Sequence, residues 1–379
     1  MADRAPAGFR LSRLLAISRK EVIQLRRDPR SLALAFLLPL LLLVLFGYAI
    51  TWDVNEIPTV VVDQDRSARS RDLVSAFRAS GYFDLRRTAD QASAVGPLID
   101  RGDVQAALVI APGFAADLDA GRTAPLQVIV DGSDANTATI IIGYTQAIVQ
   151  SYSSRVLLRG ARLQLPVRPE TRVWYNEDLV SRNTIVPGLI AVIMSIIAAM
   201  LTSLTIAREW ERGTMEQLAA TPVTRVEVVL GKLLPYLVIG VVDVVGSSVL
   251  GVLLFDVPFR GSAALLMLLS FSFLVGALGL GMFISAAAKS QILATQVAMI
   301  ATFLPAFLLS GFMYAVDVMP APLQGITYLV PARYFLVVTR GIFLKGVGAD
   351  VLFVQGLLMI AFAVVGLTLA VRAFRKELS

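Results

Sequence analysis

The chain has 379 residues, of which 56% are hydrophobic and only 16% are charged, and its formal net charge is +6. Typical soluble domains carry about 25% charged residues, so this composition indicates a membrane protein. The sequence contains no Cys and no His, which excludes disulfides, thiol chemistry and His-based zinc or Ser-His sites. We therefore expect no catalytic residues and no metal site, and the charge alone does not predict a nucleic-acid partner.

An N-terminal arm, residues 1–31, precedes the first apolar run. Leucine, valine and serine side chains recur in it at helical spacing, with basic residues largely on other faces. This pattern predicts an amphipathic helix at the membrane interface. The alternative is a plain positive flank that only orients the first span.

The first long apolar run covers residues 32–50. As a helix it would extend about 28 Å, close to the thickness of a bilayer core. Asp28 followed by Pro29 predicts the helix start. The run is longer than the apolar part of a cleaved signal peptide, so we interpret it as a retained transmembrane helix.

Residues 52–182 have a different composition, with charged residues, Gly and Pro throughout and no run long enough to span a bilayer. Short β-type runs alternate with helical patterns, which predicts a small α/β domain. The predicted strands are 58–62, 106–110 and 126–130, and the predicted helices are 70–80, 89–101 and 138–159.

The remainder, residues 183–379, contains five more apolar stretches that can each cross a bilayer. They are residues 184–206, 228–255, 263–288, 292–316 and 351–371. Between the last two, residues 317–350 form a Pro-containing segment with a short apolar piece, which predicts a re-entrant or interfacial element. The predicted fold is thus membrane α-helical, with six transmembrane helices and an α/β extracytoplasmic domain inserted between helices one and two.

Basic residues orient this chain. The arm, the loops after the second and fourth spans and the C-terminal tail hold 16 Lys and Arg, against 4 in the short loops on the other side. Because short loops rich in Lys and Arg stay in the cytoplasm, we expect both termini there and residues 52–182 outside.

The loop after the second span, residues 207–225, is the most informative segment. Trp210, Thr214 and Met215 can share one helical face, with charged residues largely on the other. Pro222 would end this helix, and Thr224 with Glu227 forms a capping box for the next one. Such a charged amphipathic helix suits the docking of a soluble partner, and a solvated loop is the alternative.

Asp243 lies near the middle of the third span. A charge there costs about 3 kcal/mol on insertion scales, so its side chain should face the bundle interior or a wet cavity. We interpret it as a residue of a translocation path, contacting substrate or an ion, or as a polar contact between helices. Pro235 and Pro305 can kink their helices, and Gly276, Gly279 and Gly281 favour close helix packing.

Several motifs together resemble one family. They are Arg26-Arg27-Asp28-Pro29, Val60-Val61-Val62-Asp63, Trp174-Tyr175-Asn176, Val186-Pro187-Gly188, Glu211-Arg212-Gly213-Thr214-Met215-Glu216-Gln217-Leu218, Ala220-Thr221-Pro222-Val223, Gly231-Lys232 and Leu309-Ser310-Gly311-Phe312. The chain resembles, over nearly its whole length, the type-2 ABC-transporter permeases, in the bacterial subgroup with a large extracytoplasmic domain after the first transmembrane helix. Trp210 departs from the pattern, which favours a charged residue there.

The resemblance implies a permease of an ATP-driven exporter in the bacterial inner membrane, moving drugs, lipids or other amphipathic substrates. It implies that the arm is an interface helix and that the loop couples to the ATPase. The implied arm residues are Arg19, Lys20, Arg26, Arg27 and Asp28. The implied ATPase-coupling residues are Glu209, Trp210, Glu211, Arg212, Gly213, Thr214, Met215, Glu216 and Gln217.

The implied partners are an ABC ATPase subunit, a second permease copy or paralogue, membrane lipid and a periplasmic adaptor. No Gly-x-x-x-x-Gly-Lys-Ser/Thr string occurs in the sequence, so we expect no cofactor on this chain and ATP on the separate ATPase. A membrane-anchored receptor or scaffold that works through residues 52–182 is the main alternative. An intramembrane enzyme or a secondary transporter fits less well, because only Asp243 among the Asp residues lies well inside a span and inverted repeats are not evident.

Overall fold

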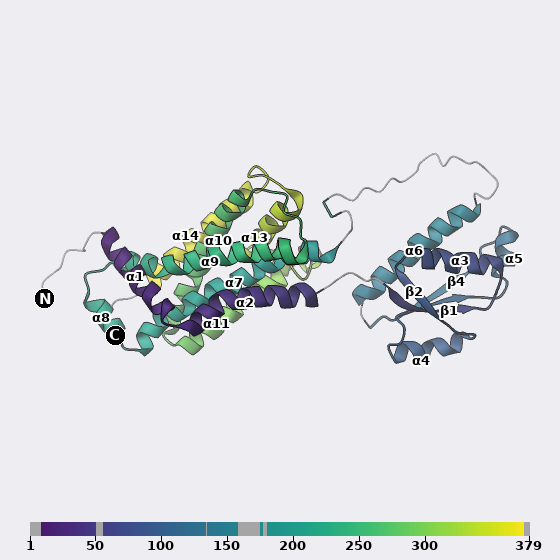
Figure 1. Ribbon diagram of the computed structural model, residues 1–379, viewed down its shortest axis with the longest axis horizontal. Helices are drawn as coiled ribbons and strands as arrows, with labels where there is room; N and C mark the ends of the chain where they lie inside the picture. Colours follow the sequence, from purple (N-terminus) through teal and green to yellow (C-terminus); the bar gives the residue numbers. More distant parts are fainter. Residues whose placement is uncertain (1–8, 51–55, 134, 158–174, 177–179, 375–379) are drawn as a thin grey trace. The chain divides into compact units, whose positions relative to one another are not determined.

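The computed structural model describes residues 9–50, 56–133, 135–157, 175–176 and 180–374. It divides into two compact units, one made of residues 1–51 with 172–379 and the other of residues 52–171. The first unit is helical, and the second combines helices with a four-stranded sheet (Figure 1). In sequence, the α/β unit follows the first long apolar helix.

The arm forms a helix, α1 (Leu11–Arg26), that packs against α9 (Arg225–Phe255). Gly231 of α9 permits this contact, because a Cβ there would lie 2.9 Å from the Ile17 Cβ. The predicted apolar face is divided in two. Of the leucine, serine and valine residues predicted to form this face, Leu14, Ser18 and Leu25 are buried, and Leu11, Leu15 and Val22 are exposed.

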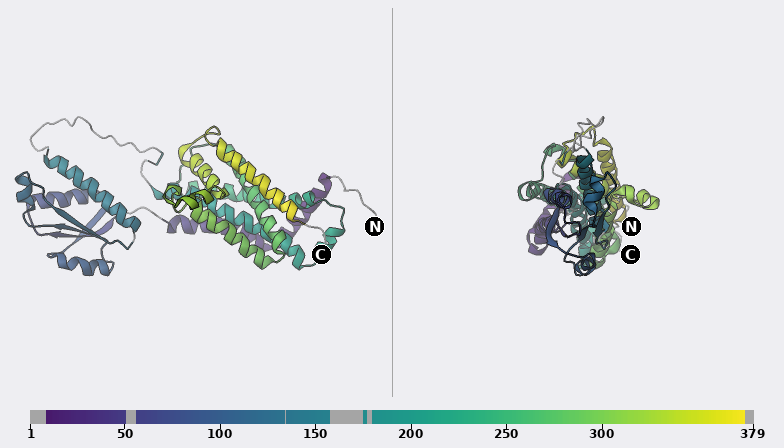
Figure 2. Two further views of the ribbon diagram at one scale, coloured as in Figure 1. Left: turned by 180° about the vertical axis from the view of Figure 1, so that it is seen from behind. Right: turned by 90° about the vertical axis from the view of Figure 1, so that its right-hand side faces the viewer.

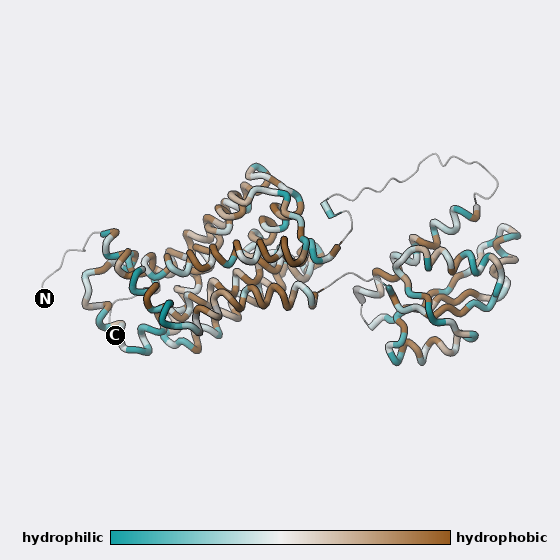
Figure 3. The backbone as a smooth tube through the Cα atoms, viewed as in Figure 1, coloured by the Kyte–Doolittle hydropathy of each residue, from teal (hydrophilic) through white to brown (hydrophobic). Residues whose placement is uncertain are grey.

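Helix α2 (Pro29–Ala49) begins at the predicted proline and contains the first apolar run. Five other helices among the described residues are long and apolar enough to cross a membrane (Figure 3), whereas the apolar part of α2, Ala35–Ala49, is shorter. They are α7 (Ser181–Glu211), α9, α10 (Ala263–Ala288), α11 (Gln291–Leu304) with its π-helical continuation Pro305–Leu309, and α14 (Phe353–Ala373).

The predicted end of the fifth apolar stretch at residue 316 is wrong, because the helix ends at Leu309. Pro305 has no N–H for the regular helical bond, and the helix changes to π geometry there. Gly311 follows with a φ of +86°, which an L side chain rarely adopts. By contrast, α9 continues through Pro235 without interruption.

Helix α14, yellow in Figure 2, lies along α10. A Cβ on Gly279 would lie 2.7 Å from the Gly366 carbonyl carbon, and a Cβ on Gly276 would overlap the ring of Phe362. Glycine at these positions therefore permits the close approach of the two helices, as predicted. On another face of α10, Gly281 lies equally close to α7 at Ala199.

Residues 317–350 contain a bent pair of helices. Helix α12 (Ala321–Thr327) meets α13 (Pro331–Arg340), which continues as a π-helical turn, Gly341–Lys345, and the pair is bent by 78°. Arg340 anchors the pair, since its guanidinium donates to the carbonyl oxygens of Thr184 at 3.2 Å and Gly311 at 3.3 Å. This geometry fits a broken span or a re-entrant loop, and the re-entrant interpretation stays a prediction.

The α/β unit contains one sheet with strand order β2-β1-β3-β4. Its strands are β1 (Ile57–Asp63), β2 (Phe83–Thr88), β3 (Ala106–Ile110) and β4 (Leu126–Val130). β1 is parallel to β2 and β3, and β4 is antiparallel to β3. Three of the four strands are predicted from sequence. β2 was not predicted because Asp84, Arg86 and Arg87 leave it only Phe83 and Leu85 as inward apolar residues.

Helices cover both faces of this sheet. α3 (Ala68–Ala79), α5 (Phe114–Asp119) and α6 (Ala135–Leu157) contribute to one apolar core, and α4 (Val95–Asp100) contributes to the other. The helix predicted over residues 89–101 is a short 3-10 turn followed by α4. Residues 158–159, predicted as the end of α6, and Trp174 lie outside the described residues.

Asp65 joins two parts of the α/β unit. Its carboxylate accepts hydrogen bonds from the N–H groups of Gly113 at 2.9 Å and Ala115 at 3.2 Å, at the start of α5. The Ser67 hydroxyl and these N–H groups hold the pKa of Asp65 below its usual value. Asp65 therefore stabilises the start of α5 in its ionised form.

Candidate functional site

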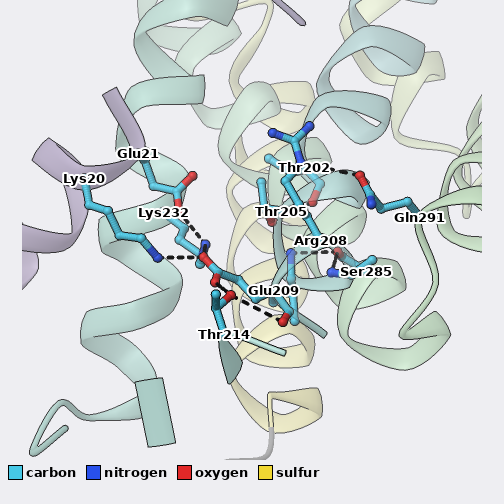
Figure 4. A network of polar contacts seen from close by, with 12 residues as sticks. Lys20, Glu21, Thr202, Thr205, Arg208, Glu209, Thr214, Lys232, Ser285 and Gln291 are labelled. Carbon is cyan, nitrogen blue, oxygen red and sulfur yellow. Dashed lines mark hydrogen bonds and ion pairs between the residues drawn. The ribbon is translucent and has the colours of Figure 1, made fainter. Parts of the chain in front are cut away.

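A buried ionic network joins α1, α7 and α9 (Figure 4). Lys232 of α9 lies between two carboxylates, because its Nζ contacts Glu21 of α1 and lies 3.1 Å from the Oε1 of Glu209 at the end of α7. Lys20 Nζ donates to the same Glu209 oxygen at 2.8 Å, and the Thr214 hydroxyl donates to the other. Three helices that are distant in sequence thus meet at one set of charges.

The network is closed to solvent at its centre. The exposed fractions of Lys232, Glu21 and Glu209 are 1%, 3% and 5%. Its two lysines and two glutamates sum to zero charge, which is the condition for burying ions without an uncompensated charge. Each charge is paired with an opposite charge on another helix. A shift of α1 or α7 relative to α9 would therefore separate buried ions, at a cost of several kcal/mol.

Contacts on the other side of α7 connect the same segment to α2, α10 and α11. Arg208 pairs with Asp28 at 3.4 Å, and the Lys289 ammonium lies 4.7 Å from the centre of the Trp210 ring. Glu211 accepts from the backbone N–H of Gln291 at 2.7 Å, at the start of α11. The end of α7 is therefore held from both sides.

Helix α7 is also tied to α10 one turn earlier. The hydroxyl of Ser285 accepts from the N–H groups of Ile206 at 3.0 Å and Ala207 at 2.9 Å. Thr205 donates to the carbonyl of Thr202 at 2.7 Å, the acceptor that the Ile206 N–H would use in a regular helix. A side chain from another helix thus enters the hydrogen-bond ladder directly before the ionic network, a recognised cause of bending.

The prediction that Trp210, Thr214 and Met215 lie on one helix that ends before Pro222 is wrong. Helix α7 continues to Glu211, a turn follows with Gly213 at a φ of +69°, and a separate short helix, α8 (Met215–Ala220), begins after it. The positive φ at Gly213 explains the break. The capping box at Thr224 and Glu227 is confirmed at the start of α9.

The arm also contacts this turn. The backbone N–H of Arg10 donates to the Glu227 carboxylate at 2.5 Å, and Arg13 donates to the carbonyl of Pro222 at 2.7 Å. The first turn of α1 therefore contacts the connection between α7 and α9, and the second half of α1 contributes Lys20 and Glu21 to the ionic network.

The predicted coupling residues fall into two groups by exposure. Glu209 and Met215 are buried, and Trp210 and Thr214 are partly buried. Glu211, Arg212, Gly213, Glu216 and Gln217 are exposed, although Glu211 is bonded to Gln291. Contact with an ATPase remains a prediction for all of them, and Arg212, Glu216 and Gln217 present the accessible side of the segment.

The predicted arm residues also differ in their contacts and exposure. Lys20 belongs to the ionic network, Asp28 pairs with Arg208, and Arg19, Arg26 and Arg27 are exposed. Asp243 lies apart from the network, farther along α9, with an exposed fraction of 2%. Its place on a translocation path remains a prediction.

The sequence alone did not assign a role to Glu21 or Lys232, the two other buried members of the network. Both carry a signal that could have identified them. Glu21 occupies the same side of α1 as the buried Leu14 and Leu25, and Lys232 follows Gly231 at the start of a membrane helix. A charge on an apolar face usually has a partner, because an unpaired buried charge is costly.

Comparison of the sequence with known proteins identifies the family of this chain. The family model described as "ABC-2 family transporter protein" matches residues 29–372, which run from the start of α2 through the α/β unit to the last turn of α14. The chain belongs to the ABC-2 transporter family. In this family the chain is a permease subunit, the transporter's ATPase is a partner subunit, and the protein is a multi-pass protein of the bacterial inner membrane.

Three relatives cover nearly the whole chain. The "Probable multidrug ABC transporter permease YbhS" of Escherichia coli strain K12 is 39% identical over 94% of this chain and 95% of the relative. The "Probable multidrug ABC transporter permease YbhR" of the same strain is 33% identical over 89% of this chain and 92% of the relative. The "Linearmycin resistance permease protein LnrN" of Bacillus subtilis strain 168 is 22% identical over 96% of this chain and all of the relative.

Proposed function

We propose that this ABC-2 permease is the membrane half of an ATP-driven exporter for drugs, lipids or other amphipathic molecules. Relatives named as multidrug permeases and a resistance permease support this substrate class. The proposed topology has six spans, both termini in the cytoplasm and the α/β unit outside, as the distribution of basic residues favours. Two permease copies or paralogues, each with an ATPase, would form the transporter within the membrane lipid.

The observation that carries the mechanism is the ionic network at Lys232. ATP binding closes an ATPase dimer, and this closure can bias the permease only through contacts that differ between two states. The exposed side of the turn and of α8, with Arg212, Glu216 and Gln217, is the proposed contact. Because α7 and α9 leave this turn and share the buried charges with α1, a push on α8 moves the three helices together.

The α/β unit has a separate proposed role. Its sheet and helices have their own two apolar cores, so it is built as a domain in its own right. We propose that it binds a periplasmic adaptor for export across a second membrane. In the competing proposal, a receptor or scaffold, this unit would be the working part and no ATPase would be required.

The deciding experiment is purification of the tagged permease from its native host in lipid nanodiscs, followed by an ATPase assay. We expect an ATP-binding subunit to co-purify with the wild type. Glu216→Arg should lower its yield about tenfold, as losing about 1.4 kcal/mol of binding free energy would. Asp317→Arg is the matched control, since it reverses an equally exposed carboxylate outside the turn and should leave the yield unchanged.

Two outcomes would contradict the proposal. Isolation of the wild type without any ATPase would favour the receptor or scaffold. An equal loss with Glu216→Arg and Asp317→Arg would show that the contact is not at α8.

A further inference from the structure

Five buried side-chain oxygens inside the membrane unit have no hydrogen-bond partner among the described residues. Two of them belong to Ser248 and Gln355, which are only partly buried, and the other three belong to buried residues. These three are Oδ2 of Asp243, Oγ of Ser247 and Oγ of Ser270. The exposed fractions of these residues are 2%, 1% and 0%. An unpaired buried polar atom costs about 1–3 kcal/mol, so three of them in one region require an explanation.

Helical register in the packing of α9 against α10 places Asp243 and Ser270 near the same level, with Ser247 about one turn away. The two helices follow one another through a short loop and run antiparallel, and a Cβ on Gly240 would lie 3.0 Å from the Leu274 side chain. One turn forward from Gly240 on α9 is Asp243, and one turn back from Leu274 on α10 is Ser270. Ser247 lies one further turn along α9, on the same face as Asp243.

No basic side chain is available to neutralise Asp243 from the neighbouring helices. Residues 183–207 of α7 and residues 263–288 of α10 contain no charged residue, and neither do residues 233–242 and 244–255 of α9. Lys232, three turns away, is paired with Glu21 and Glu209. Arg340, also in the membrane unit, donates to the carbonyls of Thr184 and Gly311.

We propose that Asp243, Ser247 and Ser270 form a binding site for a monovalent metal cation of about the size of Na⁺ between α9 and α10. Carboxylate and hydroxyl oxygens are hard ligands, which suit alkali and alkaline-earth ions. One monovalent ion neutralises one carboxylate, whereas a divalent ion would leave a net charge in the bilayer core, where charge is costly.

The three residues are buried where α9 packs against α10, so a bare ion suits this place better than a drug-sized ligand. The bound ion would hold α9 to α10 in the middle of the membrane. The site is independent of the proposed export function, because it predicts binding by the permease itself.

The test is thermal unfolding of the purified chain in nanodiscs, together with equilibrium binding of ²²Na⁺. The buffers contain NaCl or N-methyl-D-glucamine chloride at equal ionic strength. We expect a saturable rise of the melting temperature with Na⁺ and one bound ²²Na⁺ per chain. Asp243→Asn, of the same shape, should abolish both signals, and Ser247→Ala and Ser270→Ala should each weaken Na⁺ affinity about tenfold.

Asp256→Asn is the matched control, because it removes an exposed carboxylate at the end of the same helix and should keep both signals. The proposal is overturned if the wild type binds no ²²Na⁺, or if Asp243→Asn responds to Na⁺ like the wild type. It is also overturned if the melting temperature depends on pH but not on Na⁺, since Asp243 would then hold only a proton. If Asp243→Asn does not fold, unchanged Na⁺ affinity in both serine variants would overturn it.

Discussion

Lys232 is the residue on which the ionic network depends. It is the shared partner of Glu21 and Glu209, and it is buried with both carboxylates, whereas Lys20, the second cation of Glu209, is exposed. The network is weak evidence for high stability, because burying ions costs almost as much as their attraction returns. The network instead fixes the positions of α1 and α7 on α9, because a helix that slides along another separates the paired charges.

Lys232→Met should therefore destabilise the permease by about 3–5 kcal/mol, because it leaves Glu21 buried without its cation and Glu209 with Lys20 alone. Thermal unfolding in nanodiscs measures the loss. Lys345→Met is the control, since Lys345 is exposed and the substitution is chemically the same. The triple variant Lys232→Met, Glu21→Gln, Glu209→Gln should recover most of the stability, and no recovery would show that Lys232 acts through packing alone.

Among the helices, the connection between α7 and α10 at Ser285 is the clearest candidate for a hinge. Ser285→Ala removes the acceptor for the N–H groups of Ile206 and Ala207, and buried donors left unpaired cost about 1–3 kcal/mol. We expect faster hydrogen exchange at residues 205–208, measured by mass spectrometry, with the rest of α7 unchanged. Ser272→Ala on the same helix is the control, because its hydroxyl donates only to Leu268. Equal exchange in both variants would exclude a hinge there.

Most helices and strands of this fold are predictable from sequence because apolar periodicity decides them. The span over residues 263–288 and the strands 106–110 and 126–130 have the predicted ends. β2 was not predicted because its charged residues hide the apolar alternation. The break at Gly213 was not predicted because the surrounding residues suit a helix and only the backbone angle shows the turn.

The candidate site was predictable in part for a different reason. The loop motif identifies Glu209 as part of the segment, but its partners come from residues 189 and 23 positions away in the sequence, on α1 and α9. Local patterns contain no information on which helices pack together. The pairing of Lys232 with Glu21 therefore required the tertiary structure.

At the scale of the whole molecule, the two units divide the proposed work. The ionic network, the turn and α8 belong to the membrane unit, and the sheet with its two cores belongs to residues 52–171. Each unit buries its own apolar core, so removing one need not unfold the other. Contact with the ATPase and contact with an adaptor should therefore be separable by mutation.

Replacing residues 56–171 with a Gly/Ser linker should leave ATPase co-purification within about twofold of the wild type, because α2 and α7 pack together within the membrane unit. The same variant should lose adaptor binding, measured by cross-linking in cells, and with it export of the substrate. Glu216→Arg provides the reciprocal control, since it should lose the ATPase and retain the adaptor. If adaptor binding and export are unchanged after the replacement, the α/β unit is not the docking site. If the melting temperature falls and both partners are lost, the two units are not independent.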